Sequence, residues 1–201
     1  MILYGLSGYG KSSTAIEYAY RHSQEYTAIL WINSTNIGSL TDSVNSHIDP
    51  ILNAQVLEES GPNASKPCDF MKIASQLDVG FGDLSTMVTY EILKDTIAKD
   101  SIAILKKWLS RDDNNRWLLV MDNCDMRNNE LINKLIPNND QGHIIFTSTG
   151  FRPQSLVTST NTLVEEIQEL PVDDRQNILM LSAGPGLIPI GPGKFHYLIT
   201  L

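Results

Sequence analysis

The chain has 201 residues, of which 42% are hydrophobic, 7% aromatic and 19% charged, and its formal net charge is -8. This length and apolar content suit one α/β domain with a real hydrophobic core, and they exclude a disordered or collagen-like chain. The excess of acidic residues argues against a broad nucleic-acid-binding surface, and no window reaches the about 18 apolar residues of a membrane span. We therefore expect no nucleic-acid partner and no membrane partner.

Cysteine and histidine usage narrows the class further. Cys68 and Cys124 are the only two cysteines, and neither they nor the four histidines show metal-ligand spacing, which argues against a disulfide framework and a zinc site. The first residues also lack the basic, apolar and small-residue regions of a secretory signal. A cytoplasmic location is therefore expected.

The first quarter of the chain predicts two strands and two helices. Residues 2–4 are a short β-favouring run that enters a glycine-rich turn and then a helix over 12–22. The aliphatic and aromatic run 27–33 predicts a buried strand, and apolar residues then fall at helical spacing from 37 to 48. Strands and helices therefore alternate from the start.

The middle of the chain continues this alternation after a looser stretch. We interpret residues 49–100 as a helical insertion, followed by a helix at 102–109. The continuous apolar run 117–121 (WLLVM) predicts a strand covered on both faces. A helix at 131–136 that Pro137 stops precedes another apolar strand at 143–148.

Strands that alternate with helices predict an α/β fold with a mostly parallel central sheet and helices on both faces, because parallel crossovers need such helices. Ligands in such folds bind at the carboxyl ends of the strands. A further strand is expected at 162–167 and a helix around 178–181, whereas the Gly- and Pro-rich tail 183–201 predicts poor order.

Residues 5–12 read GLSGYGKS and fit the pattern GxxxxGK[ST] of a P-loop, directly after a strand and at the start of a helix. The glycines let backbone N–H groups surround a phosphate chain, and the helix N-terminus adds a partial positive charge. Lys11 would reach the β- and γ-phosphates, and Ser12 would offer a hydroxyl to Mg²⁺. The residues predicted to bind ADP or ATP are Gly5, Gly8, Tyr9, Gly10, Lys11, Ser12 and Ser13.

A P-loop needs a second Mg²⁺ ligand, usually an Asp at the carboxyl end of a neighbouring apolar strand, and Asp122 occupies that position after WLLVM. A water-orienting carboxylate often follows this Asp, but here the next residue is Asn123. Asp125 is the nearest alternative, either as a catalytic water-orienting group or as a solvated loop residue or helix N-cap. Thr147 and Ser148, at the end of the strand 143–148, either sense the γ-phosphate or are solvated strand-end groups.

Taken in chain order, GLSGYGKSS, TAILWINST, WLLVMDNCD and GHIIFTST resemble the NB-ARC family of STAND-class P-loop ATPases, especially its fungal NOD-like members. The resemblance covers residues 1–182 and implies a three-layer P-loop NTPase sandwich at 1–150 and a partial ARC-like helical segment at 151–182, followed by the tail 183–201. It implies a switch in signal transduction, in which ADP holds a closed form and ATP permits an open, self-associating form. Effector and repeat domains are the implied partners in full-length relatives, so the chain is expected to be a fragment.

Two departures from the family pattern concern hydrolysis and nucleotide sensing. The third strand motif of the family leads into an arginine, whereas Thr149 follows Ser148 here, so that arginine is missing or displaced to Arg152. The family's Gly-Leu-Pro-Leu segment has only a loose counterpart in residues 186–190. We expect slow or no hydrolysis, and the alternatives are another P-loop ATPase of the AAA type or a small-molecule kinase with real turnover, or an inactive truncated remnant.

Overall fold

The computed structural model describes residues 1–61, 66–80, 88–124, 129–137, 141–149, 162–183, 187–189 and 195–197. Strands and helices alternate through most of this length, with 3₁₀ turns at Ser23–Glu25 and Ala98–Asp100. The elements in chain order are β1 (Ile2–Gly5), α1 (Lys11–Arg21), β2 (Ala28–Asn33), α2 (Ile37–Ser60), α3 (Phe70–Gln76), α4 (Tyr90–Ile97), α5 (Ser101–Leu109), β3 (Trp117–Asp122), α6 (Asn129–Leu135), β4 (His143–Thr149), β5 (Val164–Glu166), α7 (Val172–Ala183), β6 (Leu187–Pro189) and β7 (Phe195–Tyr197).

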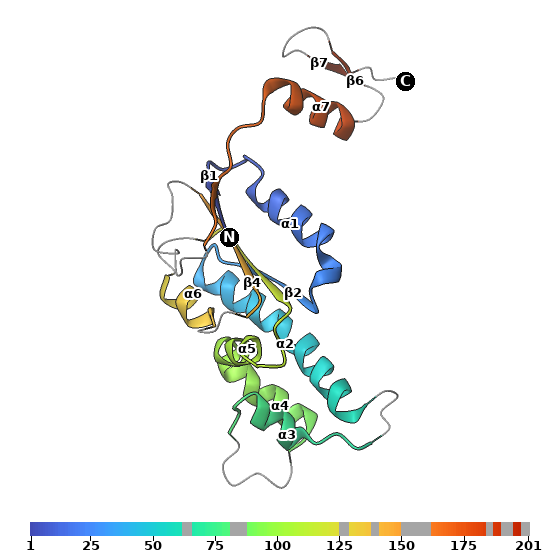
Figure 1. Ribbon diagram of the computed structural model, residues 1–201, viewed down its shortest axis with the longest axis vertical. Helices are drawn as coiled ribbons and strands as arrows, with labels where there is room; N and C mark the ends of the chain where they lie inside the picture. The colour runs from blue at the N-terminus through green and yellow to red at the C-terminus, as the bar shows by residue number, and fades with distance from the viewer. Residues whose placement is uncertain are drawn as a thin grey trace.

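Strands β1 to β5 form one sheet in the order β2-β3-β4-β1-β5 (Figure 1). Every pairing in this sheet is parallel, so the predicted α/β fold with a parallel central sheet is confirmed. The first strand of the chain lies between β4 and β5, and β4 separates β1 from β3. As a result, the carboxyl ends of β1, β3 and β4 lie at one edge of the sheet.

Helix α1 covers one face of the sheet, where it packs on β1, β3 and β4. Its buried apolar side chains are small, Ala15 and Ala19, and they meet Leu118 and Val120 of β3 and Ile145 of β4. Successive side chains of a strand point to opposite faces, so residues two positions apart on β3 or β4 point to the same face of the sheet. Side chains two residues after Val120 and Ile145 therefore also point toward α1.

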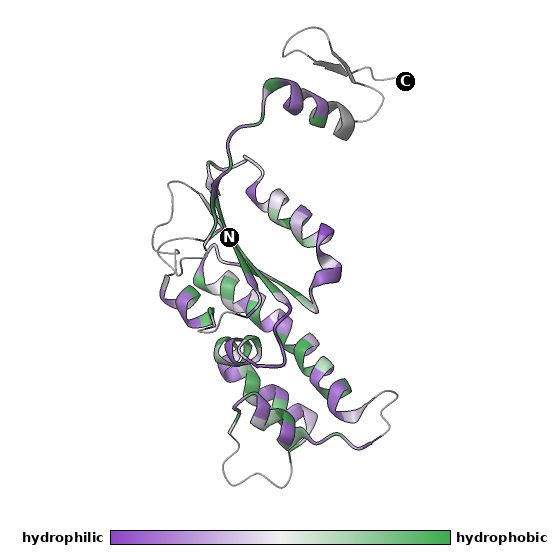
Figure 2. Ribbon diagram, in the orientation of Figure 1, coloured by the Kyte–Doolittle hydropathy of each residue, from purple (hydrophilic) through white to green (hydrophobic). Residues whose placement is uncertain are grey.

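Helices α2, α5 and α6 lie on the opposite face, with α3 and α4 beyond them (Figure 1). This larger cluster is built on the other side chains of the same strands, including Leu30, Leu119 and Phe146. Figure 2 shows the strands as a hydrophobic layer between helices whose outer sides are hydrophilic. The run 117–121 is buried on both faces, as its continuous apolar character predicts.

Helix α2 extends to Ser60, twelve residues past the end that its spacing predicts, and it contains Pro50. A proline inside a helix costs about 3 kcal/mol. Ile51 and Leu52, which follow it, are buried in the large core cluster, and burying one such side chain stabilises by about 1.5–3 kcal/mol. Core packing therefore outweighs the cost of the proline, and the helix that the spacing predicts at 37–48 continues to Ser60, into the stretch 49–100 that we interpret as a helical insertion.

Beyond β5, helix α7 lies apart from the sheet (Figure 1). Apolar side chains on and just before it, Leu170, Val172 and Ile178, are exposed. In the segment 183–201, for which the sequence predicts poor order, β6 and β7 form a two-stranded antiparallel sheet. Across the described ranges, no helix combines the length and the apolar character that crossing a bilayer requires.

Candidate functional site

The start of α1 meets the carboxyl ends of β3 and β4. Val120 and Ile145 point toward α1 and are paired in the sheet register. Two residues further on, Asp122 and Thr147 therefore point to the same face at the same level. The sheet thus places a carboxylate and a hydroxyl beside the first turn of α1.

The glycine-rich turn that connects β1 to α1 adopts a conformation that disfavours residues with side chains. Gly8 and Gly10 have φ angles of 84° and 91°, and a Cβ built on either would find no atom within 4 Å. Glycine takes positive φ without steric cost, whereas most other residues do not. The turn is therefore held open by backbone conformation, with free space where side chains would stand.

The N-terminus of α1 differs from those of the following four helices. Helices α2, α3, α4 and α5 each begin with a side chain, Asn36, Asp69, Thr89 or Asp100, that accepts a hydrogen bond from the first turn. The N-cap residue of α1 is Gly10, which has no side chain to accept such a bond, and the first turn of the helix holds no acidic residue. Its first N–H groups and the positive end of its dipole therefore face the turn, an arrangement that favours an anion.

Lys11 lies under this turn. The residue is 5% exposed, and its ammonium group donates to the carbonyl oxygens of Gly5 at 3.0 Å and Leu6 at 2.7 Å. Burial lowers the pKa of the Lys11 ammonium, and the charge of Asp122 opposes that shift. A desolvated cation held only by neutral carbonyls is a strong attractor for a negatively charged ligand.

Ser12, Asp122 and Thr147 form a hydrogen-bonded group. The Ser12 hydroxyl donates to Asp122 Oδ1 at 2.6 Å, and the Thr147 hydroxyl donates to the same oxygen at 2.5 Å. Asp122 is not on the strand next to β1, because β4 lies between β1 and β3. The expectation of a neighbouring strand was therefore wrong in this detail, although Ser12 reaches Asp122 all the same.

The turn after Asp122 is tied to the end of β4. Asn123 has a φ of 57°, and its N–H donates to Thr147 Oγ1 at 2.9 Å. The Cys124 N–H donates to the Thr147 carbonyl at 2.8 Å, and the Ser148 hydroxyl donates to the Cys124 carbonyl at 3.2 Å. Burial raises the pKa of the Cys124 thiol to about 12, so this cysteine is a protonated core residue at neutral pH.

The remaining predicted site residues either lie near the glycine-rich turn and the end of β4 or fall outside the described residues. Gly5 ends β1, Tyr9 is half-buried in the turn, and Ser13 is exposed in the first turn of α1. Thr149 is the exposed last residue of β4. Asp125 and Arg152, the candidates for water orientation and nucleotide sensing, lie outside the described residues.

The oxygen atoms of Ser12 and Asp122 fit a hard cation such as Mg²⁺, which prefers one or two protein oxygens together with phosphate and water ligands. Among the residues that the structure describes, no three His, Cys, Asp or Glu side chains gather as a metal cluster. One carboxylate and one hydroxyl beside an uncapped helix start would suit Mg²⁺ that is shared with a phosphate group.

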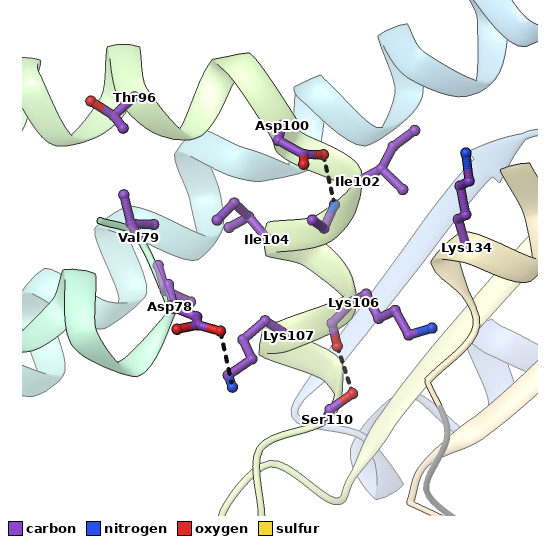
Figure 3. Close-up of a pocket in the computed structure, with 12 residues that line it drawn as sticks. Asp78, Val79, Thr96, Asp100, Ile102, Ile104, Lys106, Lys107, Ser110 and Lys134 are labelled. Carbon is purple, nitrogen blue, oxygen red and sulfur yellow. Dashed lines mark hydrogen bonds and ion pairs between the residues drawn. The ribbon is translucent and has the colours of Figure 1, made fainter. Parts of the chain in front are cut away.

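A cavity of about 760 Å³ lies elsewhere, among α3, α4, α5 and Lys134 of α6 (Figure 3). Its two acidic side chains have partners: Asp78 lies 3.7 Å from Lys107, and Asp100 caps α5 by accepting from the Ala103 N–H. Its lining comes from the helical part of the chain and not from the strand ends. We assign this cavity no ligand.

Comparison with known proteins does not assign the chain to a family, because no family model matches it and no curated protein matches it.

Proposed function

We propose that this chain is the ADP/ATP-binding core of a molecular switch of the NB-ARC kind, with a P-loop at residues 5–12 and Mg²⁺ as cofactor. The fold class that this proposal needs, a three-layer P-loop sandwich, is compatible with the parallel sheet and the helices on both of its faces. Signalling through effector and repeat domains of a longer protein, and self-association in the ATP state, belong to the same proposal.

One observation carries the proposal: the buried ammonium of Lys11 lies under an open glycine turn at an uncapped helix start. Positive φ at Gly8 and Gly10 leaves room for a phosphate chain, and the N–H groups and helix dipole supply complementary charge. In the structure, the Lys11 ammonium donates hydrogen bonds to the carbonyl oxygens of Gly5 and Leu6. Phosphate oxygens are stronger acceptors for an ammonium than neutral carbonyls.

On binding, Lys11 would turn from these carbonyls to the phosphate oxygens, and the first N–H groups of α1 would donate to the same phosphates. Mg²⁺ would supply charge neutralisation between phosphate groups, held by Ser12 and Asp122. Asp122 would keep its carboxylate oriented through its hydrogen bonds. These interactions bind and orient the nucleotide, which is what a switch requires.

Slow or absent hydrolysis follows from what stands beside Asp122. Asn123 carries no carboxylate that could accept a proton from an attacking water, and its backbone turns sharply at a φ of 57°. Thr149, at the strand end where the family has an arginine, carries no charge that could stabilise the transition state. A retained nucleotide suits a switch, because a state lasts only as long as its ligand remains unchanged.

Replacing Asp122 by Asn tests the Mg²⁺ assignment. The change removes the negative charge but leaves the glycine turn and Lys11 in place, so we expect ATP affinity with Mg²⁺ to fall about 10- to 100-fold. Affinity for ADP in EDTA should change by less than about threefold, because no metal ligand is used there. Calorimetric titration under both conditions measures the two effects, and the exposed Asp42→Asn on α2 serves as the charge-matched control. An equal loss under both conditions would assign Asp122 a structural role.

Ligand-induced stabilisation and turnover test the switch itself. A ligand that binds only the folded chain stabilises it by about 2.7 kcal/mol at 100 times Kd, and at about 2–4 °C per kcal/mol for a chain of this size the Tm should rise by about 5–10 °C. ADP and ATP should both produce this shift in a thermal scan, whereas ATP turnover stays far below the enzyme median of about 10 per second. A Tm that does not change with millimolar ADP or ATP would favour the interpretation as an inactive remnant. ATP turnover at ordinary enzyme rates would favour the interpretation as an enzyme.

A further inference from the structure

Thr147 is a fully buried threonine at the carboxyl end of β4, with two polar partners from the end of β3. Its hydroxyl donates to Asp122 Oδ1 at 2.5 Å and accepts from the Asn123 N–H at 2.9 Å. The side chain therefore joins two consecutive residues of β3 and its turn, and one of them is the proposed Mg²⁺ ligand.

The direction of both hydrogen bonds is fixed by the partners. A backbone N–H can only donate, so the Thr147 oxygen must accept from Asn123. A carboxylate can only accept, so the single hydroxyl hydrogen of Thr147 must point to Asp122. A threonine hydroxyl has one hydrogen to give, and in this arrangement it is already given. Thr147 has none left to donate to a phosphate oxygen.

The partner oxygen on Asp122 is shared with Ser12, whose hydroxyl donates to the same Oδ1 at 2.6 Å. If the Ser12 hydroxyl is drawn away from Asp122 by a ligand, Thr147 is the donor that remains on Oδ1. The orientation of the carboxylate then depends on Thr147 of the neighbouring strand β4. The hydrogen bonds that the Asn123 and Cys124 N–H groups donate to Thr147 keep this residue next to the end of β3.

From these contacts we infer that Thr147 is the positioning residue for Asp122: it holds the carboxylate in the orientation that receives Mg²⁺ and does not itself contact the nucleotide. This inference rests on the proposed function and departs from the γ-phosphate-sensing role that the sequence suggests for this position. Partners that orient metal ligands in this way typically contribute 10- to 100-fold to metal affinity.

The test compares two substitutions at this position, Thr147→Val and Thr147→Ser. Valine keeps the shape of the buried side chain but has no hydroxyl, and serine keeps the hydroxyl but lacks the methyl group. ATP affinity is measured by calorimetry for wild type and both variants, once with Mg²⁺ and once with EDTA, and the ratio of the two Kd values is the readout. Thermal scans check that each variant is folded.

In Thr147→Val we expect the gain in affinity that Mg²⁺ provides to fall about 10-fold or more, with little change in EDTA, and we expect Thr147→Ser to restore the gain. A gain that survives in Thr147→Val would overturn the inference while leaving the proposed function in place. An equal loss with Mg²⁺ and in EDTA would overturn it too, because that result indicates a direct phosphate contact or a purely structural role. A wild-type chain that binds no ATP would overturn the proposed function, and this inference with it.

A double-mutant cycle with Asp122→Ala gives a second readout that does not depend on the size of either single effect. If Thr147 acts through Asp122, Thr147→Val should cause no further loss of the Mg²⁺-dependent gain once the carboxylate is gone. Additive losses would show that Thr147 acts on its own, and would overturn the inference even if the single variant behaves as expected.

Discussion

Lys11→Ala is expected to abolish nucleotide binding, with a loss of affinity of at least about 100-fold, because hydrogen bonds to a charged group contribute about 1.5–3 kcal/mol each and Lys11 offers more than one. In the structure the Lys11 ammonium already donates two hydrogen bonds to the glycine-rich turn, to the carbonyl oxygens of Gly5 and Leu6. No other described cation contacts the turn. Calorimetric titration with ADP and with ATP measures the loss.

The fold should survive this change. Lys11 is 5% exposed, so its ammonium is desolvated in the ligand-free chain, and removing it also removes that unfavourable term. We expect the Tm without nucleotide to change by a few degrees, whereas the Tm shift with ADP disappears. Lys107→Ala, at an exposed lysine paired with Asp78, is the control and should bind nucleotide as wild type does. Unchanged ATP affinity in Lys11→Ala would refute the P-loop assignment.

Gly142→Ala is expected to cause the largest loss of stability among the described glycines outside the site, by about 2–5 kcal/mol, from left-handed backbone strain and overpacking together. Gly142 has a φ of 67°, and an added Cβ would lie 2.3 Å from the indole ring of Trp117. That ring cannot retreat easily, because it is fully buried and its Nε1 donates to the Leu109 carbonyl at 3.0 Å. A domain is stable by only about 5–15 kcal/mol in total.

Urea unfolding followed by tryptophan fluorescence measures this loss, with Gly80→Ala as the matched control. A Cβ on Gly80 would meet nothing within 4 Å, and its φ lies outside the left-handed range, so this variant should stay within about 0.5 kcal/mol of wild type, as surface substitutions usually do. Equal stability of the two variants would mean that the packing of Trp117 against Gly142 does not constrain the fold.

Features that depend on short stretches of sequence could be predicted. The run 117–121 gives a strand buried on both faces, because nothing in it is polar enough to face water. Asn36 gives the start of α2, because its side chain accepts from the Ser39 N–H. The glycine turn followed by α1 is likewise local, since positive φ at Gly8 and Gly10 is a property of those residues themselves.

Features that depend on distant partners could not be predicted from the pattern alone. Helix α2 continues through Pro50 because Ile51 and Leu52 find a core that other segments build. The order of the strands places β4 between β1 and β3, and the sequences of these strands do not indicate that order. The hydrogen bond between Thr147 and Asp122 depends on that order. Once Val120 is known to pair with Ile145, the alternation of side chains along each strand places Asp122 and Thr147 on the same face, and this signal could have suggested the bond.

The position of β1 in the sheet has a consequence for how the chain matures. During synthesis the glycine turn leaves the ribosome well before β3 and β4, yet Ile2 pairs with Phe146, and Ser12 donates to Asp122, which lies 110 residues further along the chain. Contacts this distant close late, because the entropy of the intervening loop must be overcome first. A nascent chain that does not yet include β4 therefore holds the complete glycine motif without its partners, and in the proposed switch nucleotide would bind only after the sheet has closed.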